Sequence, residues 1–422
     1  MVVCGLMNGW FSSMGDGSAL AKRGLPNHGV PVMEISLADG LELSEIDNGS
    51  KETIYEGNSV DVYSGSGVTQ YEDVEVKGRG NTTWGQVKKP YQIKFSKKVD
   101  LLGMGEAKKW VLLANYFDAS YIRNDIALLL AEMVGIEHNH RGEFVELYVD
   151  GDYRGLYYVV QKIEIAKGSV DLRNEGSALF EIDTLHKAEE ECYTTYLGEC
   201  LVLKDANFGE DTEDELIKKF VADLNEAEKA AENGDFEIVA RILDVDSFVK
   251  YFLVNEFTVN PDAYTSSFYL YRNDAGKVAA GPVWDFDFAL ANRAWSWWTE
   301  ETFFSPDESM IRKRNAFGHE GFEEDKNTSK MFYYLMDMPE FRNEVKRIFA
   351  ENMSGRSREV AAAIDNRVER IYYAAINDGL KWDRDEFQTE LKELKQWIMQ
   401  RYKHFEAEYG ETSIDRRMVS LQ

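Results

Sequence analysis

Residues 260–287 read NPDAYTSSFYLYRNDAGKVAAGPVWDFD and contain two acidic loops, one before and one after a short hairpin. Strands are predicted at residues 267–271 and 277–280, because aromatic and aliphatic residues lie on either side of the turn sequence Asn-Asp-Ala-Gly. A tight hairpin brings the chain before its first strand next to the chain after its second. Asp262 and Asp285 are therefore expected to be neighbours in space.

A pair of neighbouring carboxylates matches the needs of phosphoryl transfer. One carboxylate orients the attacking hydroxyl, and another holds the Mg²⁺ that bridges the nucleotide phosphates. Asp262 is the expected catalytic residue, and Asp285 is the expected metal ligand. The alternative is that each aspartate only caps the turn in which it lies. Because one hairpin frames the pair, catalysis is favoured over this alternative.

A turn rich in small residues is the expected phosphate-binding loop. Residues 78–84 read GRGNTTW between two predicted strands, and the backbone N–H groups of such a turn can surround a phosphate. Lys94 lies on the polar face of the next predicted strand, where its ammonium can reach a bound phosphate. Lys88 and Lys89 are nearer the turn and are expected to be more solvated. An ordinary hairpin turn is the alternative interpretation of this loop.

Two glutamates are assigned to the nucleotide site by position. Glu132 is the only acid within the apolar run at residues 126–136, and it is expected to hold the lysine of the site. A solvent-facing helix residue is the alternative for Glu132. Glu164 follows a hairpin predicted over residues 144–161, and it is expected at a hinge between two lobes, where backbone groups meet an adenine.

The chain changes character near residue 205. Residues 1–29 show no periodicity and are expected to be a loose leader. Residues 30–205 predict a β-rich lobe with the nucleotide loop, in which residues 30–165 form a twisted antiparallel sheet with one main helix. Residues 206–422 predict a helical lobe that carries the catalytic and metal loops. The expected fold class is α+β, with a small ligand held between two lobes.

Helix starts are visible in the second half of the sequence. Thr212 and Glu215 have the spacing of a capping box, which predicts a helix from this point to Gly234. Asp246 or Ser247 is the expected cap of the following helix. These signals favour helices over strands in this part of the chain.

The charge of the chain narrows the possible partners. The 422 residues include 48 basic and 75 acidic side chains, which gives a formal net charge of −27. A nucleic-acid binder needs a basic surface to displace counterions from phosphates, so the acidic charge argues against this class of protein. Attachment to anionic lipid is disfavoured for the same reason. No apolar run is long enough to span a bilayer, and no signal peptide is visible.

Three cysteines are too few for a disulfide framework. Cys192 and Cys200 are close enough in sequence to close a small loop, but two unpaired thiols are expected. His186 is the only histidine near them and completes no zinc-ligand spacing, so a zinc site is not expected.

Seven segments besides the loop at 78–84 extend the pattern along the chain. They are KKPYQIK at 88–94, LLANYFD at 112–118, Arg-Asn at 123–124, GDYRGLY at 151–157, Asn-Glu at 255–256, NPD at 260–262 and PVWDFD at 282–287. Together with GRGNTTW these segments resemble the spore-coat CotH family of atypical, secreted-type protein kinases. The resemblance covers about residues 30–293, and the ordered series is more specific than any one motif.

The resemblance implies a bilobal protein-kinase-like fold that binds ATP with Mg²⁺ or Mn²⁺. It implies transfer of the γ-phosphate to Ser or Thr of another protein, with Asp262 as the catalytic acid and Asp285 as the metal ligand. The residues expected to bind the nucleotide are Arg79, Gly80, Asn81, Thr82, Lys94, Glu132 and Glu164. The family also implies a bacterial protein of the spore coat or cell surface, whose partner is a Ser/Thr-rich or basic coat or surface protein.

One position departs from the wider kinase pattern. Kinases place a metal-binding Asn five residues after the catalytic Asp, and this chain has Ser267 there. Ser267 is therefore expected to be a poorer metal ligand, which Asp287 is expected to supplement. The alternative function is a catalytically weak or inactive kinase-like coat or surface protein that binds protein or glycan. The aromatic cluster of Trp295, Trp297 and Trp298 supports this alternative as a platform for a peptide or sugar.

Overall fold

The structure, a computed structural model, describes residues 20, 24–65, 67–184, 191–208, 212–264, 266–294, 305–307, 309 and 330–410. Contacts divide the chain into two compact units. The first comprises Met1–Tyr121, Arg141–Lys162 and Asp365–Glu390, and the second comprises Ile122–His140, Ile163–Ile364 and Leu391–Gln422. The predicted boundary near residue 205 rests on composition rather than on contacts, and it stays a prediction.

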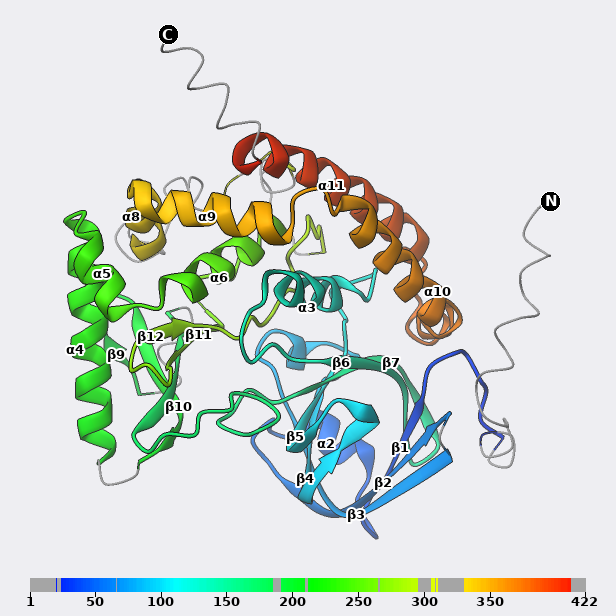
Figure 1. The fold of residues 1–422 in the computed structure, drawn as a ribbon. Helices are drawn as coiled ribbons and strands as arrows, with labels where there is room; N and C mark the ends of the chain where they lie inside the picture. The colour runs from blue at the N-terminus through cyan, green and yellow to red at the C-terminus, as the bar shows by residue number, and fades with distance from the viewer. Residues whose placement is uncertain are drawn as a thin grey trace. The chain divides into compact units, whose positions relative to one another are not determined.

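A closed barrel forms the core of the first unit (Figure 1). Its strands are β1 (Val32–Ser36), β2 (Tyr55–Ser64), β3 (Gly67–Gly78), β4 (Tyr91–Asp100), β5 (Glu106–Leu113), β6 (Gly142–Val149) and β7 (Asp152–Gln161). Their order around the barrel is β1-β2-β3-β4-β5-β7-β6, and a parallel pair of β6 with β1 closes the ring. The predicted hairpin at 144–161 is confirmed as β6 and β7.

The predicted twisted antiparallel sheet needs a correction in two respects. The strands close into a barrel, and β1 is antiparallel to β2 but parallel to β6. Closure removes the unpaired edges that an open sheet would expose to other chains. The pairing of β1 with β6 joins segments that lie far apart in sequence. Local sequence patterns such as hydrophobic alternation and turn residues do not predict this pairing.

Alternation along the strands fills the barrel with apolar side chains. Val74 and Val76 of β3 and Ile93 and Phe95 of β4 are buried in one cluster, whereas Lys94 between them is not. Successive side chains of a strand point to opposite faces, so one face supplies the interior and the other meets solvent. The helix α2 (Leu43–Asn48) adds Ile46 to the same cluster.

A wholly buried ion pair joins the barrel to α10 (Ser357–Trp382) within the first unit. Lys88 Nζ lies 2.5 Å from Asp378 Oδ2 and 2.7 Å from the Leu156 carbonyl oxygen, and both charged side chains are 0% exposed. Lys88 was expected to be solvated, so this expectation is wrong. Glycine at position 155 lets the Asp378 carboxylate come close to the barrel, because a Cβ there would lie 2.1 Å from Asp378 Oδ2. The φ of Gly155 is +107°, which also favours glycine.

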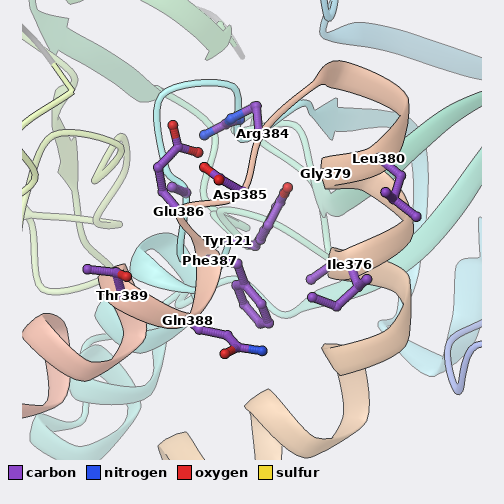
Figure 2. A pocket seen from close by; sticks show the side chains of 12 residues that line it. Tyr121, Ile376, Gly379, Leu380, Arg384, Asp385, Glu386, Phe387, Gln388 and Thr389 are labelled. Atoms are coloured by element: carbon purple, nitrogen blue, oxygen red, sulfur yellow. The ribbon is translucent and has the colours of Figure 1, made fainter.

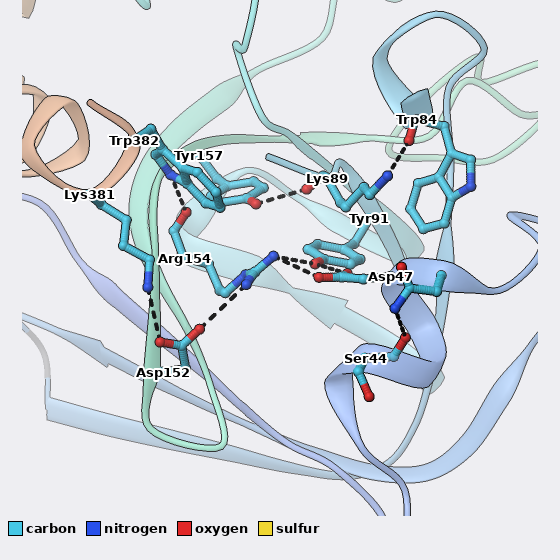
Figure 3. A network of polar contacts seen from close by, with 11 residues as sticks. Ser44, Asp47, Trp84, Lys89, Tyr91, Asp152, Arg154, Tyr157, Lys381 and Trp382 are labelled. Carbon is cyan, nitrogen blue, oxygen red and sulfur yellow. Dashed lines mark hydrogen bonds and ion pairs between the residues drawn. The ribbon is translucent and has the colours of Figure 1, made fainter. Parts of the chain in front are cut away.

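A second polar network surrounds Arg154 in the same unit (Figure 3). Arg154 Nη2 lies 2.8 Å from Asp47 Oδ2, and the Tyr91 hydroxyl donates to Asp47 Oδ1 at 2.6 Å. Trp382 Nε1 of α10 donates to the Arg154 carbonyl at 3.1 Å. The motif segments at 88–94 and 151–157 therefore contribute to the packing of α10 against the barrel.

The second unit contains several α-helices and one antiparallel sheet. The sheet has the order β12-β11-β8-β10-β9, with β8 (Ser177–Ile182), β9 (Tyr193–Thr194), β10 (Cys200–Asn207), β11 (Phe268–Arg272) and β12 (Val278–Ala280). The helices are α3 (Arg123–Val134), α4 (Glu213–Glu232), α5 (Phe236–Ile242), α6 (Val245–Thr258), α8 (Lys330–Asp337), α9 (Pro339–Asn352) and most of α11 (Phe387–Tyr409). The expected α+β class, with a β-rich first part and a helical last part, is confirmed.

Aromatic side chains anchor the start of the hairpin formed by β11 and β12. The rings of Tyr251 and Phe268 lie 4.5 Å apart, and Tyr264 lies 4.5 Å from Phe332 of α8. Aromatic pairs at such separations add about 0.5–1.5 kcal/mol beyond burial. Tyr264 and Phe268 are therefore each held by an aromatic ring, from α8 and α6 respectively.

Helix caps agree in part with the sequence. The capping box of Thr212 and Glu215 at the start of α4 is confirmed. The cap of α6 is Asp244, whose side chain accepts a hydrogen bond from the Ser247 N–H, so the expectation of Asp246 or Ser247 is wrong. The sequence does not distinguish the cap, because aspartates occur at both 244 and 246 and either could cap a helix that begins with the following apolar residues.

Cys192 and Cys200 form a disulfide in the structure, which corrects the expectation of two unpaired thiols. The Cα atoms lie 5.4 Å apart. The pairing of β9 with β10, which places Cys200 opposite Thr194, brings the two cysteines together. Spacing in the sequence allowed this pairing but could not establish it.

Glu228 of α4 is expected to make stability depend on pH. Its Oε2 accepts from the Leu197 N–H at 2.7 Å, and burial raises its pKa to about 7. The folded chain then keeps a proton that the unfolded chain releases near pH 4.5, so the contribution to stability is full below 4.5 and is lost as pH rises through 7. The loss amounts to roughly 3 kcal/mol.

Urea unfolding at pH 5 and pH 8 would measure this effect. Glu228→Gln is expected to lose less stability than the native chain between the two pH values. Glu237→Gln, at an exposed position of α5, serves as the control and should behave like the native chain. An unchanged pH response in Glu228→Gln would show that another group causes it.

Within the residues that the structure describes, no helix combines the length and the apolar character needed to cross a membrane.

Candidate active site

The side chain of Asn260 links the two acidic loops of the second unit. Its Nδ2 donates to the Asp285 carbonyl at 3.2 Å and lies 3.2 Å from Asn255 Oδ1, and its Oδ1 accepts from the Asp262 N–H at 3.2 Å. α6 ends immediately before, and Val259 adopts a left-handed φ of 49° that turns the chain. The structure thus brings residues 262 and 285 onto one amide, as the hairpin argument expects.

Asp285 and Ser267 face one another across the base of the hairpin. Ser267 Oγ donates to Asp285 Oδ2 at 3.4 Å. Both residues have a left-handed backbone, with a φ of 55° at Ser267 and of 64° at Asp285. Such conformations cost about 1–3 kcal/mol for residues other than glycine and tend to gather at functional sites. Tyr264, Leu290 and Ala291 share this property, so backbone strain is concentrated around these loops.

Asn124 of α3 holds the second acidic loop from the other side. Its Nδ2 donates to Asp287 Oδ1 at 2.5 Å, and its Oδ1 accepts from the Phe286 N–H at 3.0 Å. Asn292 Nδ2 also donates to the Asp287 carbonyl. Asn124 is buried, as is Asp287, so this loop has a defined position in the unit.

Neighbouring residues fix the backbone at both loops. The Asp262 carbonyl accepts from the Ser266 N–H at 3.1 Å. Arg123 Nε donates to the Ala289 carbonyl at 3.1 Å. At the end of α6, Arg401 of α11 donates through Nε to the Phe257 carbonyl at 3.1 Å. Arginine near a helix C-terminus satisfies carbonyls that lack partners within the helix.

Sequence reasoning gave no role to the amides that organise this site. Asn124 and Asn260 were quoted within motifs, but nothing local shows that their side chains bond to a loop more than twenty residues away. The feature of the sequence that could have drawn attention to Asn124 and Asn260 is their position in short polar motifs next to apolar helices. Arg401 lies outside every quoted motif and had no signal of this kind.

His140 packs beside the second acidic loop without adding charge to it. Its ring lies 5.8 Å from that of Trp284, in an edge-to-face arrangement. Burial lowers the pKa of His140 to about 4, so the ring is neutral at pH 7. His140 therefore places no positive charge beside the loop of Asp285 at pH 7.

The oxygen atoms of this site are of the kind that Mg²⁺ binds. Asp285, Asp287 and Ser267 supply carboxylate and hydroxyl oxygens, and Mg²⁺ in phosphoryl-transfer sites uses one or two carboxylates together with water and substrate phosphates. Over the described part of the chain, no three His, Cys, Asp or Glu side chains form a group that could hold a metal alone. The oxygen donors suit Mg²⁺ by their chemistry, and their assignment as metal ligands stays a prediction.

The predicted phosphate loop lies in the first unit and folds tightly on itself. A Cβ at Gly78 would come within 2.4 Å of the Trp84 ring, and one at Gly80, whose φ is +84°, within 2.2 Å of Thr83 Oγ1. Close packing thus explains both glycines without a ligand. The role of the loop in phosphate binding stays a prediction.

The other expected ligands of this loop have partners within the first unit. The Arg79 N–H donates to the Pro90 carbonyl at 3.3 Å, and Asn81 Oδ1 accepts from Lys51 Nζ. The Thr82 carbonyl accepts from Gln86 Nε2 at 3.3 Å. These contacts hold the backbone of the loop and leave its predicted function open to test.

Lys94 forms an ion pair on the outside of the barrel. Its Nζ lies 2.7 Å from Glu75 Oε1, its neighbour across β3 and β4, and its side chain is 37% exposed. A surface pair of this kind contributes about 0–1 kcal/mol, so the lysine could exchange Glu75 for a phosphate at little cost. Its assignment to the nucleotide stays a prediction.

Glu132 and Glu164 belong to the second unit. Glu132 is exposed near the end of α3. The Glu164 N–H donates to Ser169 Oγ at 3.3 Å, and its carbonyl accepts from the Val170 N–H. Neither position tests the predicted role. Trp295, Trp297 and Trp298, and most of the leader at 1–29, lie outside the described residues.

Comparison with known proteins identifies the family of this chain. The family profile described as CotH kinase protein matches residues 75–405, which is most of the chain and includes both acidic loops. The chain belongs to the CotH kinase protein family. The expected resemblance is thereby confirmed.

A relative and a solved structure complete the comparison. The CotH chain is 24% identical over 224 residues to the inner spore coat protein H of Bacillus subtilis (strain 168), a match that covers 51% of this chain. It spans 58% of the length of that relative. The crystal structure of the Helicobacter pylori proinflammatory kinase CtkA overlaps 78% of this chain and 95% of its own, with a TM-score of 0.31 and 8% identity.

Proposed function

We propose that this CotH-family chain is an atypical protein kinase that transfers the γ-phosphate of ATP to Ser or Thr of a protein substrate. Asp262 orients the substrate hydroxyl, and Asp285 binds Mg²⁺ or Mn²⁺ with help from Asp287 and Ser267. One observation carries the proposal: the Asn260 amide holds the Asp262 N–H and the Asp285 carbonyl at once. This contact supports the proposal, because phosphoryl transfer depends on positioned carboxylates and one amide that binds both loops keeps the loops close together.

The chain's own residues account for binding and orientation. Asn260 and Asn124 hold the two acidic loops, and Lys94 with residues 79–82 contacts the phosphates. A bound Mg²⁺ supplies charge neutralisation at the phosphate oxygens. A bilobal protein-kinase-like fold is part of the same proposal.

A second candidate is a kinase-like coat or surface protein with weak or absent catalysis. Ser267 stands where kinases have a metal-binding amide, and its hydroxyl bonds to Asp285. Asp287 is likewise engaged by Asn124. Each contact competes with a metal for the same oxygen, which favours this alternative if nucleotide binding fails.

We also propose a location in the spore coat or at the cell surface. The relative in Bacillus subtilis carries the name inner spore coat protein. The disulfide of Cys192 and Cys200 agrees with an oxidising compartment, since disulfides seldom persist in a reducing cytosol.

A thermal-shift measurement with ATP and Mg²⁺ tests the proposal and separates the two candidates. A nucleotide present at about 100 times its dissociation constant should stabilise the native chain by about 2.7 kcal/mol. Asp285→Asn should lose most of this metal-dependent shift, because the carboxylate charge that attracts the cation is gone. Labelled phosphate on basic and acidic acceptor proteins, in Mg²⁺ and in Mn²⁺, then reports transfer. The absence of both shift and transfer at millimolar nucleotide would support the non-catalytic alternative.

A further inference from the structure

A pocket of about 280 Å³ lies at the corner between α10 and α11, within the first unit (Figure 2). We call residues 375–389 the α10–α11 corner. Ile376 and Leu380 of α10 line one side of the pocket, and Phe387 of α11 and Tyr121 also contribute to its wall. The volume is just below the ~300–1,000 Å³ of sites for whole small ligands. It suits one or two side chains better than a nucleotide.

Apolar surface at this corner is exposed to an unusual degree. Leu380 is 79% exposed, and Ile376 is 37% exposed. The two residues are four apart on one helix, so they lie on the same face. Apolar side chains that gather at the rim of a pocket mark interaction sites more often than scattered ones do.

Charged groups at the same corner indicate the chemistry of the occupant. Figure 2 shows Asp385 and Glu386 on the side of the pocket away from Ile376 and Leu380. Both acids are exposed, and among the described residues neither carboxylate has an ion-pair partner. Their charge favours lysine or arginine in the occupant.

Arg384 supplies a hydrogen-bond donor that has no acceptor in the part of the chain that the structure describes. Its Nη1 is buried and lacks an acceptor among the described residues, and its guanidinium lies 5.5 Å from the centre of the Tyr116 ring. A buried N–H group without an acceptor costs about 1–3 kcal/mol. A backbone carbonyl of a bound segment would satisfy it.

We propose that the α10–α11 corner binds a short segment of a partner protein in which a bulky apolar side chain is flanked by lysine or arginine. The apolar side chain fills the pocket beside Ile376 and Leu380. The basic side chains meet Asp385 and Glu386, and a backbone carbonyl accepts from Arg384. Binding at this corner needs no nucleotide, so it stands or falls independently of the proposed phosphotransfer.

Fluorescence anisotropy of the full chain without nucleotide tests this inference. The probe is a labelled peptide with one leucine between pairs of lysines, and matched peptides replace the leucine by serine or the lysines by glutamate. The first peptide should bind, and either replacement should weaken binding by about tenfold or more. Higher salt should weaken the first peptide as well.

Variants of the chain locate the site. Leu380→Ser, and the double variant Asp385→Asn with Glu386→Gln, should each weaken binding of the leucine peptide by about tenfold. Ile54→Ser changes a residue that is 53% exposed outside the corner and should bind like the native chain. The inference is overturned by no binding at millimolar peptide, by equal binding of the glutamate peptide, or by unchanged binding in both corner variants. Sedimentation that shows a dimer dispersed by Leu380→Ser would also overturn it, since a second copy would then be the occupant.

Discussion

Asp262→Asn is expected to lower the rate of phosphate transfer by about 10²–10⁴-fold, the typical contribution of a positioned general acid or base. The amide matches the carboxylate in shape but cannot accept the proton of a substrate hydroxyl. The backbone of residue 262 is held by Asn260 and Ser266, so the loop should keep its position. Transfer of labelled phosphate at saturating ATP and Mg²⁺ measures the effect.

The nucleotide response separates a catalytic role from a structural one. Asp262→Asn should keep the thermal shift produced by ATP and Mg²⁺, whereas Asp285→Asn should lose it. Asp274→Asn, in the exposed turn of the same hairpin, is the matched control and should transfer phosphate like the native chain. A transfer rate for Asp262→Asn within about twofold of the native rate would remove Asp262 from the mechanism.

Lys88→Met is expected to lower the free energy of unfolding by about 3–5 kcal/mol, because it leaves the buried Asp378 carboxylate without its cation. Burial lowers the pKa of Lys88 to about 8, and Asp378 opposes the shift, so the lysine is charged at pH 7. Asp378 would retain the Tyr121 hydroxyl at 2.7 Å and the Leu156 N–H at 2.7 Å. Two neutral donors do not replace an ammonium.

Urea unfolding of two comparison variants makes this test specific. Lys97→Met removes a lysine from an exposed position of the nearby strand β4 and should change the free energy of unfolding by less than about 0.5 kcal/mol. Lys88→Met combined with Asp378→Asn should be more stable than Lys88→Met alone, since the amide oxygen keeps an acceptor without the buried charge. Equal losses in Lys88→Met and Lys97→Met would contradict the energetic role of the ion pair.

Local signals predicted much of the secondary structure and the position of the acidic loops. The turn Asn273–Gly276 and the apolar residues around it predicted β11 and β12 almost to the residue. The capping box at Thr212 predicted the start of α4. These features depend on interactions within a few residues, and the hydrophobic period and turn chemistry of a sequence record such interactions directly.

Contacts between distant segments were the main source of error. Lys88 stands next to Lys89 in a polar stretch and looks solvated, yet Asp378 of α10 buries it. Closure of the barrel by β1 and β6 likewise depends on a contact between distant segments. Each contact joins segments more than one hundred residues apart, and a single sequence gives no information on such partners.

The sequence alone determined that an acidic loop follows α6, that a second one follows the hairpin, and that the short turn draws them together. The tertiary structure decided which side chains hold them there: Asn124 from α3 and Asn260 from the end of α6. The physical reason is that hydrogen bonds of side-chain amides depend on distances of about 3 Å between elements. Only the packed fold sets distances of that size.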